Sequence, residues 1–179
     1  QNTFVGSLAG DAYNVGHTNV AVGYLALSAD TKGALSVAVG AGALQTQNFT
    51  TATNSYNVGV GNNAGAALAT GTRNTFVGGL AGDATDDGLD NTAMGYGSLS
   101  ANCGSYNTSI GIHTLSVCTG ASNTCVGHAA GLAVTGGSNN LFLGNNSGRT
   151  GSPGGNFTTE SNRMVLGDEN MTNAHIQVA

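Results

Sequence analysis

Cysteine, histidine and aspartate are the side chains in this sequence whose chemistry could serve catalysis, metal binding or cross-linking. The 179 residues contain three cysteines, four histidines and nine acidic residues. Thiols can pair or bind metals, imidazoles can bind metals or move protons, and two carboxylates facing a cleft can hydrolyse a glycosidic bond. Which of these reactions is open to the chain depends on the side chains that the fold brings together.

A cluster of acids, Asp83, Asp86, Asp87 and Asp90, falls within one short segment. A glycosidase needs two carboxylates that face each other across a cleft, whereas these four share a single turn. The spacing around Gly88 does not fit an EF-hand calcium loop. We therefore expect a turn that is exposed to solvent or contacts a Ca²⁺ ion, and no catalytic pair of carboxylates.

The element that must position these side chains is a repeat of 16–17 residues. One glycine recurs at spacings of 17, 17, 21, 17, 17, 16, 16, 17 and 23 residues. These repeat glycines are Gly6, Gly23, Gly40, Gly61, Gly78, Gly95, Gly111, Gly127, Gly144 and Gly167. The period is too short for helical-hairpin repeats and is typical of a solenoid. We predict an all-β fold, a parallel β-solenoid of about ten coils.

The residues before each repeat glycine predict a short strand in every coil. The position directly before it, the aliphatic column, holds only Val, Met, Ile or Leu, and the position three before it is mostly Val or Thr. These positions share one strand face. We expect the position between them, the middle column, to face outward with Phe4, Phe76 and Phe142. Because apolar side chains on both faces of a strand need cover, this pattern implies partner chains.

Two further columns indicate how each coil turns. Four residues before the repeat glycine, in the asparagine column, eight of ten coils carry Asn, and Ser36 and Arg163 fill the other two. Asn tolerates a left-handed backbone and can stack into ladders, so we expect it at the corner before each strand. Four residues after the glycine, the Gly/Leu column of the first nine coils holds only those two types. This restriction predicts a second short strand packed over the first.

The repeat divides the chain into three parts. We assign residues 1–147 to the solenoid repeats, residues 148–161 to a Gly/Pro/Ser/Thr loop insertion, and residues 162–179 to a terminal coil and C-terminal strand. The 21-residue spacing predicts an outward bulge from Gln45 to Ser55. Insertions in solenoids map to surface loops, often on a binding face.

The repeat also places the cysteines. Cys125 occupies the middle column, where a small buried filler is the simplest interpretation. Cys103 and Cys118 lie eight and seven residues after consecutive repeat glycines, so they should be neighbours on adjacent coils. A disulfide between Cys103 and Cys118 and two free thiols both remain open.

The histidines and two tyrosines have surface positions in the repeat. The four histidines are His17, His113, His128 and His175. They lie at different phases, so they do not stack into a metal site, although one of them on a trimer axis could hold an ion. Tyr24 and Tyr96 directly follow repeat glycines and could stack on sugars or cover the edge of the roll.

Composition excludes several classes of function. Four basic residues and a net charge of −5 cannot form a phosphate-tracking stripe, so we expect no nucleic-acid partner. No apolar run approaches the 18–20 residues needed to span a bilayer. No nucleophile motif or phosphate loop is present, so we expect a protein that is not an enzyme and has no catalytic residue, cofactor or metal. An ice-binding solenoid would need an exposed Thr-x-Thr array, which the sequence lacks.

Three stretches resemble known families. Residues 36–43, Ser-Val-Ala-Val-Gly-Ala-Gly-Ala, resemble the head repeat of YadA-like trimeric autotransporter adhesins. Residues 74–82, Asn-Thr-Phe-Val-Gly-Gly-Leu-Ala-Gly, resemble the shaft or tip of bacteriophage tail fibres. Residues 162–167 and 173–179 resemble the stretch before an intramolecular chaperone domain of the endosialidase type, which trimerises fibres and then cuts itself off.

These resemblances imply a left-handed β-roll in which three chains associate around one axis. They imply a structural and adhesive segment of a phage tail fibre, located in the virion, with a chaperone domain cleaved away after residue 179 or missing from a truncated chain. The partners would be two further copies, other tail or fibre proteins, and a host-cell receptor such as a glycan. The alternative is the head of a bacterial surface adhesin, located on the cell surface.

Overall fold

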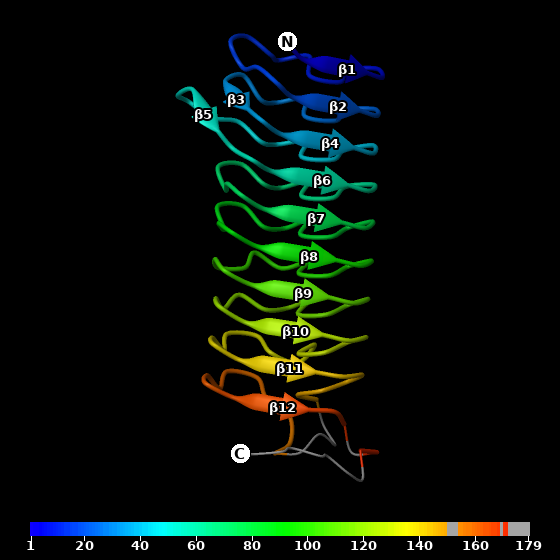
Figure 1. The fold of residues 1–179 in the computed structure, drawn as a ribbon, viewed down its shortest axis with the longest axis vertical. Helices are drawn as coiled ribbons and strands as arrows, with labels where there is room; N and C mark the ends of the chain where they lie inside the picture. Colours follow the sequence, from blue (N-terminus) through cyan, green and yellow to red (C-terminus); the bar gives the residue numbers. More distant parts are fainter. Residues whose placement is uncertain (150–153, 169, 172–179) are drawn as a thin grey trace, which may run out of the picture.

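The computed structural model describes residues 1–149, 154–168 and 170–171, and it confirms an all-β parallel solenoid (Figure 1). Ten strands of three residues, one from each coil, stack into a single parallel sheet that runs the length of the rod. Their bounds are β1 (Thr3–Val5), β2 (Val20–Val22), β4 (Val37–Val39), β6 (Val58–Val60), β7 (Thr75–Val77), β8 (Thr92–Met94), β9 (Thr108–Ile110), β10 (Thr124–Val126), β11 (Leu141–Leu143) and β12 (Met164–Leu166). Equivalent columns pair in register throughout the described coils.

A second, two-stranded sheet accounts for the coil with the 21-residue spacing. Strands β3 (Gly33–Ala34) and β5 (Thr53–Asn54) pair in parallel, and the Ser55 N–H donates to the Ala34 carbonyl at 2.9 Å. Figure 1 shows β5 leaning out from the side of the main stack. The side chain of Phe49 is buried within this bulge, and its burial stabilises the extra residues of the coil.

The strand faces are the reverse of the prediction. Phe76 and Phe142, which we expected to face outward, are fully buried, and the middle column lines the core. The aliphatic column faces solvent instead: Val5 is 56% exposed and Met94 46%. Both faces carry apolar residues, so hydrophobicity alone could not orient the strand.

Complementary volumes explain why the middle column belongs inside. Coils with Phe in the middle column have Gly in the Gly/Leu column, as in Phe76 with Gly82, where an added Cβ would lie 2.6 Å from the ring. Coils with Ala in the middle column have Leu there, as in Ala93 with Leu99, and both are fully buried. Coils of these two kinds therefore fill a thin interior with one large and one small residue, whereas the β6 coil has Gly59 and Gly65 and is filled by Leu44 and Phe76 of its neighbours.

The prediction of a second strand after each repeat glycine is wrong. Residues of the Gly/Leu column have φ between +49° and +80°, which is left-handed backbone, and the segment is a series of turns. The stack is still held together there, because the Leu99 N–H donates to the Thr114 carbonyl of the next coil at 2.9 Å. A residue with left-handed backbone does not fit a strand. The Gly/Leu column is therefore restricted to two residue types by the volume available in the core.

The asparagine column forms the expected ladder at the corner before each strand. The Asn107 Oδ1 accepts the Asn123 backbone N–H at 3.0 Å, and the Asn107 Nδ2 donates to the Gly120 carbonyl at 3.1 Å. The left-handed backbone falls one residue earlier than we predicted, in an edge column with φ between +52° and +67°. The edge column comprises Thr18, Leu35, Tyr56, Arg73, Asp90, Tyr106, Ser122, Asn139 and Asn162.

Part of the predicted C-terminal organisation lies outside the described residues. The loop insertion at 148–161 is described only at its two ends, and Pro153 is not within them. Strand β12 supplies the predicted terminal coil, whereas the predicted final strand at 173–179, with His175, lies outside the described residues.

Candidate functional site

The four acids of the cluster lie in different environments. Asp86 and Asp87 are exposed, and Asp90 forms an ion pair in which its Oδ1 lies 2.6 Å from Arg73 Nε of the preceding coil. Hydrogen bonding to Arg73 lowers the pKa of Asp90. Within the described ranges, no three His, Cys, Asp or Glu side chains gather closely enough to hold a metal ion.

Asp83 differs from the other acids of the cluster because it is partly buried. Its Oδ1 has no hydrogen-bond partner among the described residues. Burial raises the pKa of this carboxyl, and a hydrogen bond from Ser100 offsets part of the effect. Among the described residues, no other acid contributes to this shift.

All three cysteines are buried free thiols. Cys103 and Cys118 are close enough for Cys103 to affect the pKa of Cys118, but no bond joins them here, and the disulfide between them stays a prediction. Burial raises the pKa of Cys118 to about 11 and raises those of Cys103 and Cys125. Thiols this hard to ionise are poor nucleophiles, so they act as core fillers.

The outer face of the main sheet is the most extended surface feature of the rod. It consists of the aliphatic column and the column two residues before it. The latter holds Thr3, Val20, Val37, Val58, Thr75, Thr92, Thr108, Thr124, Leu141 and Met164. Neither column contains a charged residue, and β7 to β10 place four threonines beside one another in register. The result is an uncharged, largely apolar strip along the whole sheet.

Aromatic residues lie at the margins of this strip. Tyr96 follows β8, is 52% exposed, and meets the His113 ring edge-on with centroids 5.4 Å apart. Tyr24 is exposed to a similar extent, and Tyr56 and Tyr106 are exposed in the edge column at the opposite margin. About half of Tyr24 and of Tyr96 is open to solvent, and both roles predicted for them, stacking on a sugar and covering the edge of the roll, stay predictions.

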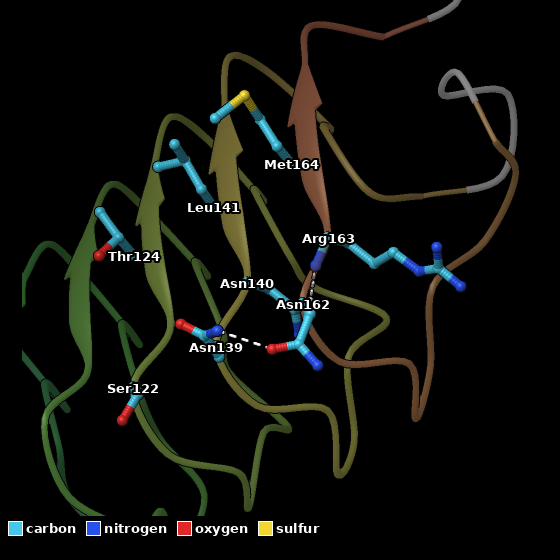
Figure 2. Close-up of a pocket in the computed structure, with 8 residues that line it drawn as sticks. All are labelled: Ser122, Thr124, Asn139, Asn140, Leu141, Asn162, Arg163 and Met164. Carbon is cyan, nitrogen blue, oxygen red and sulfur yellow. Dashed lines mark hydrogen bonds between the residues drawn. The ribbon is translucent and has the colours of Figure 1, made fainter.

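A trough of about 340 Å³ lies over β10, β11 and β12, and Figure 2 shows its lining. It runs across the edge column and the neighbouring strand positions of three successive coils. The lining residues are Ser122, Thr124, Asn139, Asn140, Leu141, Asn162, Arg163 and Met164. Nothing in the single sequence marks these residues as a group, because only stacking in register brings them together.

Three side-chain amides line the trough and are held by hydrogen bonds. The Asn139 Nδ2 donates to the Asn162 Oδ1 at 2.7 Å, and both residues have left-handed backbone. The Asn140 Oδ1 accepts the Arg163 N–H at 2.9 Å, which extends the ladder into the last described coil. Figure 2 shows the Arg163 side chain extending away from the other residues, so the guanidinium does not enter the trough.

The chain was compared with protein families, curated proteins and solved structures. None of them matches. Interpretation of the trough and the outer face therefore rests on their own geometry and chemistry. In the part of the chain that the structure describes, no helix has the length and apolarity to cross a membrane.

Proposed function

We propose that the chain is a structural and adhesive segment of a trimeric fibre of the phage-tail type, carried on the virion, that presents a surface to a host receptor. The observation that carries the proposal is the outer face, an uncharged strip that faces solvent along all ten strands and is partly to fully exposed. Exposed apolar patches of this extent mark interaction surfaces. The sequence resemblances to tail fibres and to trimeric adhesins support this interpretation and imply that the partners are further copies of the same chain.

The size of the outer face fits association of three chains. Ten strands spaced about 4.8 Å apart give a strip roughly 45 Å long. With a width of about 12 Å, each chain offers on the order of 500 Å², so three chains together would cover about 1,500 Å² around one axis. Threefold closure places the aliphatic column of every chain against its neighbours, with the column two residues before it at the margin of the contact.

Substitution of the outer face tests the proposal. Val126→Glu adds a carboxylate to β10 at a position that is 38% exposed, and in a trimer it brings three negative charges to one level. Because like charges in a closed interface are costly, we expect the variant to sediment as a monomer of 17.6 kDa and the unchanged chain at three times that mass.

Val117→Glu is the matched control. Val117 is 45% exposed, has the same side chain, and lies in the turn region away from the outer face. We expect this variant to remain trimeric, with circular dichroism confirming that both variants are folded. A chain that sediments as a monomer at micromolar concentration without any substitution would contradict the proposal.

A further inference from the structure

We infer that the trough over β10, β11 and β12 binds a neutral saccharide, an inference that rests on the proposed adhesive function and gives its receptor a chemical class. Its lining combines side-chain amides, hydroxyls and two apolar side chains. Such a mixture suits a sugar ring, which presents hydroxyls at its rim and C–H groups on its faces.

The polar groups of the trough are complementary to sugar hydroxyls, each of which both donates and accepts. The bond between Asn139 Nδ2 and Asn162 Oδ1 leaves two groups of this pair, the Asn139 Oδ1 acceptor and the Asn162 Nδ2 donor, without a partner among the described residues. The hydroxyls of Ser122 and Thr124 lie on the neighbouring coil and can rotate to donate or accept. An array that offers both senses of hydrogen bond is what a vicinal diol requires.

The apolar side of the trough offers contact to the face of a sugar ring. Met164 is 68% exposed, and Leu141 lies beside it in register on β11. Thioether side chains are flexible and adapt to irregular apolar surfaces. A ring seated on the amides would cover part of the Met164 side chain, so binding would bury apolar area that is now in water.

The charges around the trough favour a neutral ligand over an acidic one. Among the described residues, no carboxylate or ammonium group lines it, and the guanidinium of Arg163 is directed away (Figure 2). The whole chain carries a net charge of −5, which repels polyanions at long range. A sialylated or sulfated glycan would therefore gain no paired cation within the trough.

The position of the trough keeps it accessible in the proposed fibre. The edge column lies four residues before the aliphatic column, a separation of about 10 Å across the sheet. Chains that meet along the aliphatic column alone would leave the edge column, and the strand margin that carries Leu141 and Met164, open to solvent. Three equivalent troughs would then act together, which raises avidity for a multivalent cell surface.

The test is NMR titration of the intact chain with methyl glycosides of glucose, galactose, mannose and N-acetylglucosamine, and separately with N-acetylneuraminic acid. We expect at least one neutral glycoside to shift the amide signals of Asn139 and Asn162 with millimolar affinity. Asn139→Gly with Asn162→Gly removes both amides but keeps the left-handed backbone. We expect this double variant to lose at least tenfold in affinity, and Thr124→Val to weaken binding several-fold.

Asn63→Gly is the matched control, because Asn63 is also a left-handed asparagine but lies on a coil far from the trough. It should bind as the unchanged chain does. Absence of binding by every neutral glycoside, equal binding by the double variant, or binding of the acidic sugar alone would overturn the inference. Sedimentation tests the proposed trimer separately. A chain that is trimeric but binds no saccharide would contradict the inferred saccharide site and would still support the proposed assembly.

Discussion

At the scale of single residues, the repeat glycines set how closely coils can stack. Gly111 has φ of +136°, and a Cβ placed on it would lie 2.4 Å from the Gly127 carbonyl oxygen of the next coil. The same contact recurs up the stack, with Gly127 against Gly144 at 2.5 Å. A side chain at any of these sites would require both an unfavourable backbone and a displaced neighbour.

Gly111→Ala should therefore destabilise the fold strongly, by about 3 kcal/mol or more, because it adds backbone strain to a steric clash. The measurement is the midpoint of thermal unfolding followed by circular dichroism. Gly136→Ala provides the comparison, since Gly136 lies in an exposed turn with no atom within 4 Å of an added Cβ. We expect its midpoint to stay close to that of the unchanged chain, and equal losses in the two variants would contradict this explanation.

Much of this residue-level order could be predicted from the sequence, but the direction of the side chains could not. Spacing alone located the strands, the terminating glycine and the asparagine corner. The orientation of Phe76 required knowing that Gly82 lies opposite it, a pairing of volumes that only the folded coil reveals. The trough was missed for a related reason, because Asn139 and Asn162 become neighbours only when a 23-residue spacing still closes into register.

At the scale of the coil, the asparagine ladder is the main polar element. In one coil a serine occupies the asparagine column, and other side chains take over its hydrogen bonds. Ser36 is too short to replace the amide. The side chain of Gln47 crosses the core instead: its Oε1 accepts the Asn57 Nδ2 at 2.8 Å, and its Nε2 donates to Asp30 Oδ2 at 2.6 Å. The buried carboxylate of Asp30 also accepts the Gly33 N–H at 2.8 Å, so the network is satisfied locally.

Removing a central member of the ladder should be costly. Asn107→Ala leaves the buried Asn123 N–H without its acceptor and removes one of the two donors to the Gly120 carbonyl, and an unsatisfied buried group costs about 1–3 kcal/mol. We expect a loss of about 2–4 kcal/mol in the free energy of unfolding, measured by denaturant titration. Asn62→Ala, at an exposed site, should change it by less than about 0.5 kcal/mol. A small loss for Asn107→Ala would mean that water replaces the ladder.

At the scale of the whole molecule, the rod is a one-dimensional stack in which each coil contacts its neighbours above and below. Strand β1 pairs only with β2 among the described strands, and two of its three residues are exposed. The equivalent residues of β7 lie between β6 and β8 and are more buried. Stability in such arrays is the sum of intrinsic and nearest-neighbour contributions, so coils inside the stack gain more than the first one.

Hydrogen exchange should reveal this gradient at two matched amides. Thr3 donates its N–H to the Asn19 carbonyl at 2.9 Å, and Thr75 donates the equivalent bond to the Asn91 carbonyl at 2.8 Å. The residue type and the bond are the same, and only the place in the stack differs. Because end coils fray, we expect the Thr3 amide to exchange at least about 100-fold faster than the Thr75 amide. Equal rates would indicate that the chain opens as one cooperative unit.

The direction of the hydrogen bonds between coils has a mechanical consequence. Both the sheet and the asparagine ladder join each coil to the next, so these bonds run along the rod axis. A pull along that axis loads every junction in series, and the weakest junction yields first. Each coil that unfolds would release about 17 residues, which extend to roughly 55 Å. A rod built in this way lengthens in steps under load and dissipates work at each step, and it re-forms by stacking when the load is removed.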